Sequence, residues 1–235
     1  HAINAIVPGN TANTAFLTTE GHRDILVFRE GGRMEPFNFT VPYPQPYLPR
    51  ALSYEIPGRI LSDASEMNPL DEGRVVEILE ELKAKEVEAI AVCLLWSIIN
   101  SAHEDRVGEL IEQHLPGVPY TLSNVLNPSL REYRRASSAA IDASLKPLMS
   151  AYMHNLTGRL SDAGFAGRVL IATSQGGMMD ASDVAEHPIH LINSGPSMAP
   201  VSGRYFARED EGSDTAVIAD TGGTTYDVSL VRRGR

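Results

Sequence analysis

The sequence predicts an α/β fold with a mostly parallel sheet, and the alternation of its central elements carries that prediction. Residues 68–87 have the spacing of an amphipathic helix, and residues 88–97, EAIAVCLLWS, form a fully apolar strand pattern. A second helical pattern covers residues 101–115, and another strand pattern covers residues 118–126. Helix, strand, helix, strand in this order is typical of parallel α/β units.

The segments before this core are less regular. Residues 14–19, TAFLTT, are predicted to form a strand that ends at Gly21, and residues 23–30 a strand or short helix. Residues 31–57 are so rich in proline that they exclude a helix and a central strand. We expect an ordered excursion, because its aromatic side chains offer much area to bury. These are Phe37, Phe39, Tyr43, Tyr47 and Tyr54.

The segments after the core return to helices and strands. Residues 127–165 form a long helical pattern, in which Pro147 should start a new segment or produce a kink, and which Gly164 should end. Residues 168–177 are predicted to be an apolar strand leading into a Gly-Gly turn. Residues 187–209 are predicted to form a strand, a tight turn and a helix.

Composition narrows the class of protein. The chain has 235 residues and a formal net charge of -10, from 30 acidic and 20 basic residues, which argues against nucleic acid or an anionic membrane as a partner. No apolar stretch is long enough for a membrane helix. The single cysteine, Cys93, lies in an apolar run, and a buried thiol fits a reducing, cytoplasmic location. The chain starts at His1 and stops at RRGR, so we expect a piece of a longer protein.

The clearest chemical signal is the segment AVIADTGGTTYDVSLV, residues 216–231, which predicts a hairpin. Glycines allow closely spaced backbone N–H groups to point at a phosphate, and threonine hydroxyls add donors. Asp220 precedes the glycines at the end of an apolar strand that we expect to be buried, a good position for holding Mg²⁺. The predicted phosphate cradle is Gly222, Gly223, Thr224 and Thr225. An ordinary Gly-Gly hairpin turn is the alternative.

A second candidate is the segment INSGPS. Ser194 and Gly195 follow an apolar run, and Pro196 suits the first position of a helix, so free N–H groups should lie where α/β proteins bind ligands. An ordinary turn between two elements explains the segment equally well. Ser174 and Gln175, in TSQGGMM, could line the same cleft.

Other polar clusters are expected to be structural. His187 and His190 flank Pro188, which rules out a regular helix that would align them as metal ligands. Glu104 and Asp105, next to His103, lie in a first helical turn, where acidic residues commonly interact with the helix dipole. The arginines of the long helical segment are expected to be solvated or ion-paired. These are Arg131, Arg134 and Arg135.

These motifs together resemble the A-type subunit of the hydantoinase/oxoprolinase family. IADTGGTTYDVSLV looks like the second phosphate-binding hairpin of the actin, sugar kinase and Hsp70 superfamily. TAFLTTEGHRDIL, CLLWSIINSAHEDRV, NPSLREYRRASSAAIDASLKPLM and INSGP have counterparts in the family in the same order. HAINAI resembles the family's HGTTVATNA, although Ala2, Ile3 and Asn4 replace Gly-Thr-Thr. The family's first phosphate loop would precede His1.

The resemblance implies a fold, cofactors and partners. It implies a ribonuclease-H-like, actin-like ATPase fold, present in part, with a mixed sheet flanked by helices. ATP and Mg²⁺ are the implied cofactors, with Asp220 and His1 as catalytic residues and Asp220 as the metal ligand. A B-type subunit and a small-molecule substrate are the implied partners. Residues 1–134 correspond to the family's N-terminal region, and residues 135–235 to the start of its second domain.

The implied reaction is phosphorylation of a carbonyl oxygen by ATP, which activates a cyclic amide for hydrolysis. An ATP-dependent carboxylase of ketones such as acetone or acetophenone is the alternative within the family. An actin-like, nucleotide-dependent scaffold without small-molecule chemistry is the alternative from another class. The fragment by itself is expected to be inactive, because the opposing phosphate loop and the adenosine-binding loop lie outside it.

Overall fold

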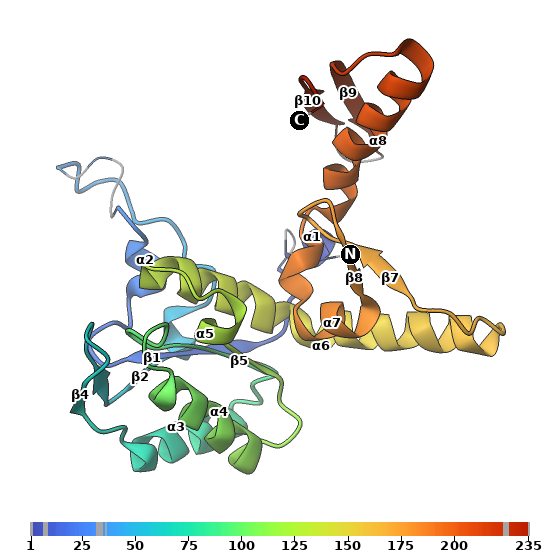
Figure 1. Ribbon diagram of the computed structural model, residues 1–235. Coiled ribbons are helices and arrows are strands. Elements are labelled where there is room, and N and C mark those ends of the chain that lie inside the picture. Colours follow the sequence, from blue (N-terminus) through green and yellow to red (C-terminus); the bar gives the residue numbers. More distant parts are fainter. Residues whose placement is uncertain (1, 7–8, 32–34, 36, 223–225, 235) are drawn as a thin grey trace. The chain divides into compact units, whose positions relative to one another are not determined.

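The computed structural model of the chain describes residues 2–6, 9–31, 35, 37–222 and 226–234 (Figure 1). The chain divides into two compact units, one of residues 10–148 and one of residues 1–9 together with 149–235.

The unit of residues 10–148 is built on a four-stranded sheet. Its strands are β1 (Thr14–Thr19), β2 (Ser53–Ile56), β5 (Ala89–Cys93) and β6 (Tyr120–Leu122), in the order β2-β1-β5-β6. Every neighbouring pair is parallel, with Phe16 opposite Ser53 on one side and opposite Ala91 on the other. The sheet that we expected to be mixed is therefore parallel throughout, and the antiparallel pairs form separate two-stranded sheets.

Helices cover both faces of this sheet, which explains the fully apolar strands. On one face, α3 (Glu72–Ala84) and α4 (Ala102–His114) pack on Leu17, Ile90 and Val92. On the other face, α2 (Ile25–Phe28) and the first half of α6 (Glu132–Asp162) pack on Phe16 and Cys93. The predicted helices and apolar strands of residues 68–126 are confirmed, with ends shifted by a few residues.

The proline-rich segment is only partly as expected. It ends in the 3₁₀ helix η1 (Arg50–Leu52) and in β2, which lies at the edge of the sheet, where a neighbouring proline is tolerated. Phe37 and Phe39 are 92% and 79% exposed, so the expectation that they are buried was wrong. A small hairpin of β3 (Arg59–Ile60) and β4 (Glu66–Asn68) follows.

The long helical segment forms one helix, α6, with Pro147 inside it. The two compact units meet in sequence within this helix, after Leu148. The helix ends as predicted at Gly164, which has φ +87° and donates its N–H to the Ser161 carbonyl. A short helix, α5 (Ser123–Leu126), connects β6 to the approach to α6.

The unit that contains residues 149–235 has smaller elements. After α6 come the hairpin β7 (Leu170–Ala172) and β8 (Met178–Asp180), then α7 (Ala181–Glu186), η2 (Pro188–Leu191) and α8 (Ser194–Glu211). The hairpin β9 (Ala216–Thr221) and β10 (Tyr226–Val231) follows, and α1 (Ala2–Ile6) belongs to the same unit.

The prediction of a strand before α8 was wrong. Pro188 has no N–H to offer to a sheet and instead occupies the first turn of the 3₁₀ helix η2. Within the described residues, no helix is both long and apolar enough to cross a membrane.

Candidate functional site

The hairpin of β9 and β10 is where the sequence predicted a phosphate cradle. Asp220 lies near the end of β9, and Gly222 follows the strand. Four of the predicted site residues lie outside the described residues: His1, Gly223, Thr224 and Thr225.

The register of the hairpin brings two carboxylates together. Asp220 is directly opposite Asp227 of β10, so both lie on the same face of the hairpin. Like charges opposite each other destabilise a strand pair unless a cation lies between them. Mg²⁺ is commonly held by one or two carboxylates, with phosphate oxygens and water as its other ligands, so this pair fits a Mg²⁺–phosphate complex. No group of three or more potential metal ligands occurs among the described residues.

Sequence reasoning missed Asp227. The signal for it was the hairpin itself, because a turn between Thr221 and Tyr226 places Asp220 and Asp227 at equal distances from the turn.

The helix α8 packs on the hairpin. A Cβ atom at Gly203 would overlap the Ile218 side chain, so the helix and β9 are in close contact there. This contact places α8 against the face of the hairpin that carries Ile218, Asp220 and Asp227.

The two other glycine-containing turns are joined to each other. Ser197 at the start of α8 donates its hydroxyl to the Thr173 carbonyl at 3.0 Å, and the Ser174 N–H donates to the His190 carbonyl at 2.7 Å. The segments TSQGG and INSGPS thus lie side by side, as expected from their similar sequence context. Asn193 precedes α8 in a left-handed conformation, and Gly195 is exposed.

One premise of the hairpin prediction was wrong. β9 is not a buried strand in this chain: Val217 is 72% exposed and Asp220 is also exposed. The reason is that β9 and β10 form a two-stranded sheet of which α8 covers one face. The opposite face carries Val217, Tyr226, Val228 and Leu230, all more than 60% exposed.

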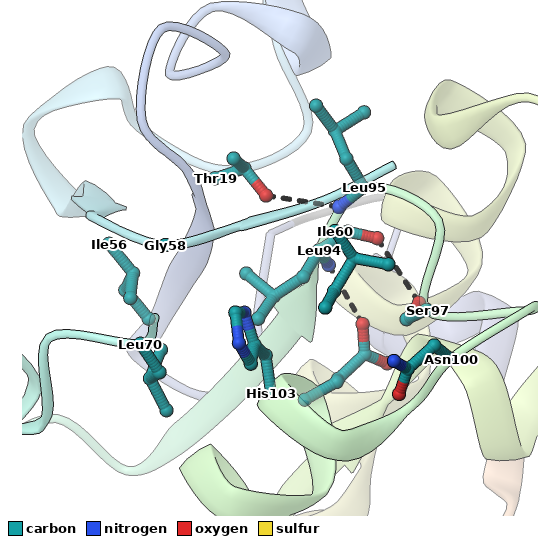
Figure 2. A pocket seen from close by; sticks show the side chains of 11 residues that line it. Thr19, Ile56, Gly58, Ile60, Leu70, Leu94, Leu95, Ser97, Asn100 and His103 are labelled. Atoms are coloured by element: carbon teal, nitrogen blue, oxygen red, sulfur yellow. Dashed lines mark hydrogen bonds between the residues drawn. The ribbon is translucent and has the colours of Figure 1, made fainter. Parts of the chain in front are cut away.

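A second polar site lies at the carboxyl edge of the parallel sheet. The chain leaves β1 toward β2 and returns past β1 to β5, so the order of the strands reverses between β1 and β5. Ligands of open α/β sheets bind outside the carboxyl ends of the strands at such a point. Here the two strand ends are tied together, because Thr19 accepts the Leu95 N–H at 3.0 Å (Figure 2).

A cavity of about 10 Å³, the size of one water molecule, lies under this edge (Figure 2). Its apolar wall comes from Ile56, Ile60 and Leu70, and its polar groups come from the end of β1, the segment after β5 and the start of α4. His103 also lines the cavity. The Nε2 atom of His103 lies 2.6 Å from the Glu66 carboxylate, and Gly58, whose φ is +139°, packs against the imidazole ring. The cavity is too small for an organic ligand, so any substrate must bind outside it.

Glu104 and Arg135 lie beneath the same edge and are both fully buried. Glu104 accepts the backbone N–H groups of Leu94 at 2.7 Å and Asn124 at 2.8 Å. Arg135 donates to the carbonyls of Leu94 at 2.8 Å and of Ser129 at 3.1 Å. Burial raises the pKa of Glu104, while the hydrogen bonds that it accepts act in the opposite direction.

Glu104 lies in the first turn of α4, as predicted, but the sequence did not indicate its burial. Arg135 was expected to be solvated or ion-paired, and that expectation was wrong, because tertiary packing places it in the interior. Arg134 behaves as predicted and pairs with Glu30 at 2.8 Å. Cys93, the predicted buried thiol, is 2% exposed, and burial raises its pKa to about 12.

An open hollow of about 320 Å³ lies beyond β1 and β2 at the same edge. Three arginines line it, and one of them, Arg50, donates two hydrogen bonds to the Asp24 carboxylate. Glu55 accepts the Gly21 N–H. The arrangement holds the loop after β1 in place. The lining arginines are Arg23, Arg29 and Arg50.

Comparisons with known proteins agree on one family. The sequence model of the hydantoinase/oxoprolinase N-terminal region matches residues 1–115, and that of hydantoinase/oxoprolinase matches residues 135–235. The alpha subunit of caprolactamase from Pseudomonas jessenii is 32% identical over all of this chain and 34% of its own length. The gamma subunit of acetophenone carboxylase from Aromatoleum aromaticum is 33% identical over 98% of this chain and 33% of its own length.

Solved structures give the same result. The crystal structure of ATP-dependent caprolactamase from Pseudomonas jessenii matches 97% of this chain, and 33% of that chain, with a TM-score of 0.84 and 30% identity. A nucleotide-free structure of acetone carboxylase, at 21% identity and a TM-score of 0.82, shares the fold. The chain thus spans about a third of the length of these relatives.

Proposed function

The chain belongs to the hydantoinase/oxoprolinase family, and from this membership we propose that the longer protein uses ATP to phosphorylate a carbonyl oxygen and so drives hydrolysis of a cyclic amide. Phosphorylation of the amide oxygen makes the carbonyl carbon more electrophilic, so water can add there and the ring nitrogen can leave as the amine. The acyl phosphate that remains is then hydrolysed to a carboxylate and inorganic phosphate. Electrostatic stabilisation at the phosphates would carry most of the catalysis.

The single observation that carries this proposal is the carboxylate pair beside the glycine turn. Asp220 and Asp227 would hold Mg²⁺, which neutralises phosphate charge when bound. The N–H groups and hydroxyls of residues 222–225 would orient the phosphates, and Ser194 and Gly195 would donate from the start of α8. His1 stays a proposed catalytic residue, supported by its resemblance to the family histidine.

The relatives support ATP use and leave two classes of substrate. Caprolactamase and the 5-oxoprolinase of Saccharomyces cerevisiae, which is 27% identical, are named for cyclic amides. The 33% identity to an acetophenone carboxylase subunit favours a second candidate, an ATP-dependent ketone carboxylase. An actin-like scaffold, the remaining alternative, predicts ATP turnover that responds to assembly and not to a small molecule.

Partners, location and domain limits are also proposed. Several relatives are named as subunits, so the protein is proposed to act with another chain, specifically a B-type subunit. The buried, single thiol is compatible with the proposed cytoplasmic location. A functional boundary at residues 134–135 is proposed on the family pattern, whereas the compact units divide after residue 148.

The test is substrate-dependent ATP turnover by the full-length protein with its partner subunit. ATP hydrolysis that rises with lactams or hydantoins, with ring-opened product, supports the cyclic amidase. A rise that needs a ketone together with bicarbonate supports the carboxylase. No response to any of these compounds, with turnover that changes only on assembly, would overturn both enzyme proposals.

A further inference from the structure

We propose that Glu104 and Arg135 are positioning residues that fix the loop of residues 94–97 at the carboxyl edge of the parallel sheet, and that this loop orients the organic substrate. The identity of the substrate rests on the proposed function. The hydrogen bonds of Glu104 and Arg135 to this loop, which we call the clamp, are a property of the unit of residues 10–148.

The clamp holds one residue, Leu94, through both its N–H and its carbonyl. The N–H of Leu94 donates to the Glu104 carboxylate at 2.7 Å, and the carbonyl of Leu94 accepts from Arg135 at 2.8 Å and from Ser97 at 3.1 Å. Hydrogen bonds to charged groups are stronger than those between neutral groups, and here both charged side chains are fully buried. Leu94 is the first residue after β5, so the clamp fixes the point where the loop leaves the sheet.

The same two side chains also fix the neighbouring loop. Ser123, the first residue of α5, donates its hydroxyl to Glu104 at 3.2 Å and accepts from Arg135 at 3.3 Å. The Asn124 N–H donates to Glu104, and the Ser129 carbonyl accepts from Arg135. The segments that follow β5 and β6 are therefore held in register by one carboxylate and one guanidinium joined through a hydroxyl.

The loop contains a conformation that needs such support. Trp96 has φ +58°, which is a backbone outlier for a bulky side chain. Strained residues persist only where their surroundings determine them, and they cluster at functional sites. The carbonyl of Trp96 accepts from the N–H groups of Ile99 and Asn100, so the far side of the turn is also tied down.

The position of the loop points to the substrate. It lies where the strand order reverses between β1 and β5, at the edge where α/β sheets bind ligands. The apolar side chains at its surface are Trp96 of the loop, which is half-buried, and Ile99 in the turn that follows the loop, which is 53% exposed. Such a surface suits the uncharged ring or chain of an amide or ketone better than a nucleotide phosphate.

A matched control for Glu104 lies on α6, the helix of Arg135. Asp142 is also fully buried, and it accepts the Thr121 hydroxyl at 2.8 Å beside Lys146, whose ammonium donates to the Tyr120 carbonyl. These two hydrogen bonds are made to the strand β6, because Thr121 and Tyr120 both lie within it. Glu104→Gln and Asp142→Asn are both changes of a buried acid to an amide of the same size, so they should cost similar stability.

The experiment measures hydrogen exchange, Tm and kinetics of the full-length enzyme. Glu104→Gln leaves one backbone N–H without its acceptor, so exchange should rise in residues 94–97 and at residue 124, and Asp142→Asn should leave both segments protected. With Glu104→Gln, kcat/KM for the organic substrate should fall about tenfold or more, since small misplacements of positioning groups have effects of this size. The KM for ATP should change little, and Asp142→Asn should retain activity at an equal loss in Tm.

Three outcomes would overturn the proposal. If hydrogen exchange in residues 94–97 rises equally in both variants, Glu104 has no specific effect on the loop and only stabilises the fold in general. A fall in activity that follows Tm in both variants, or a rise in the KM for ATP with unchanged use of the organic substrate, would also contradict it. If Glu104→Gln does not fold, Ser123→Ala removes only the bridging hydroxyl and should give the same pattern more weakly. If the wild-type enzyme uses neither amide nor ketone, the proposed function fails, while hydrogen exchange still decides whether the clamp exists.

Discussion

The two compact units differ in how completely they bury their apolar residues. In residues 10–148, helices cover both faces of the sheet, and two clusters of fully buried side chains result. In residues 149–235, six apolar residues are buried among those that the structure describes: Met149, Met153, Ala181, Val184, Ala185 and Val231. The hairpin that carries Asp220 has one face on α8 and an exposed apolar face.

The two units are therefore expected to contribute differently to stability. The first unit has the buried area to be a stable scaffold, and its polar edge is held by buried charges. The hairpin has little buried area, and a two-stranded sheet is only marginally stable by itself. The stability of residues 1–235 should therefore reside mainly in residues 10–148, and the hairpin should be a region of low local stability in this chain.

The largest expected effect tests where the stability resides. Phe16→Ala should destabilise the unit of residues 10–148 by about 3–5 kcal/mol, because Phe16 is fully buried between β1 and α6. Leu230→Ala, on the exposed face of the hairpin, should change stability by less than about 0.5 kcal/mol. Urea unfolding followed by tryptophan fluorescence measures this, because the single tryptophan, Trp96, lies in the first unit. Equal losses in the free energy of unfolding for the two variants would contradict the view that the stability resides in residues 10–148.

The next effect tests how tightly the first unit is closed. Cys93 is the only cysteine, and at about pH 8 its raised pKa should lower the thiolate population by roughly a thousandfold relative to an unfolded chain. A thiol reagent should therefore label the native protein very slowly and the denatured protein at once. Labelling should accelerate only as the pH approaches the raised pKa. Rapid native labelling near neutrality would show that the unit opens readily.

A smaller effect, on activity and not on stability, is expected in the hairpin. In the full-length enzyme, Asp220→Ala should lower turnover by more than about tenfold through the loss of Mg²⁺ positioning, and Asp227→Ala should act in the same direction. Tm should not fall, since the change removes the repulsion between Asp220 and Asp227. Asp214→Ala is the control, because Asp214 is an exposed acid of the same unit that pairs with Arg208. Unchanged turnover in Asp220→Ala would show that the hairpin is not part of the proposed Mg²⁺–phosphate site.

The smallest effect is expected for nucleotide binding to residues 1–235 alone. One phosphate cradle offers a few hydrogen bonds, each contributing on the order of 1 kcal/mol, against an association cost of roughly 4–15 kcal/mol. Calorimetry with Mg-ATP should therefore detect weak binding or none. Micromolar or tighter binding would contradict the assignment of the hairpin as only part of the site.

The sequence predicted elements well where a local pattern was sufficient. The amphipathic spacing of residues 68–87 predicted α3, and the apolar run after it predicted β5 and the burial of Cys93. Residues 187–192 were assigned wrongly, because an apolar run around Pro188 has the composition of a strand but cannot pair as one.

The site was harder to predict because burial is decided by partners far apart in sequence. Glu104 and Arg135 are separated by 31 positions, and neither local pattern indicates that Ser123 would bring them together. Asp227 could have been found, since it lies as far after the turn as Asp220 lies before it. The carboxyl edge of the sheet emerged only once the strand order was known.

The strand order also determines when the protein can fold during its synthesis. β1 is an inner strand, and its partner β5 is 75 residues later in the chain, with Phe16 opposite Ala91. At a translation rate of about 5–20 residues per second, the ribosome needs roughly 4–15 s to add those residues. During that interval the apolar strand TAFLTT has no neighbour on that side and is open to chaperones or to other nascent chains. Slowing translation between residues 20 and 90 should therefore lower the yield of folded protein, whereas slowing it after residue 150 should not.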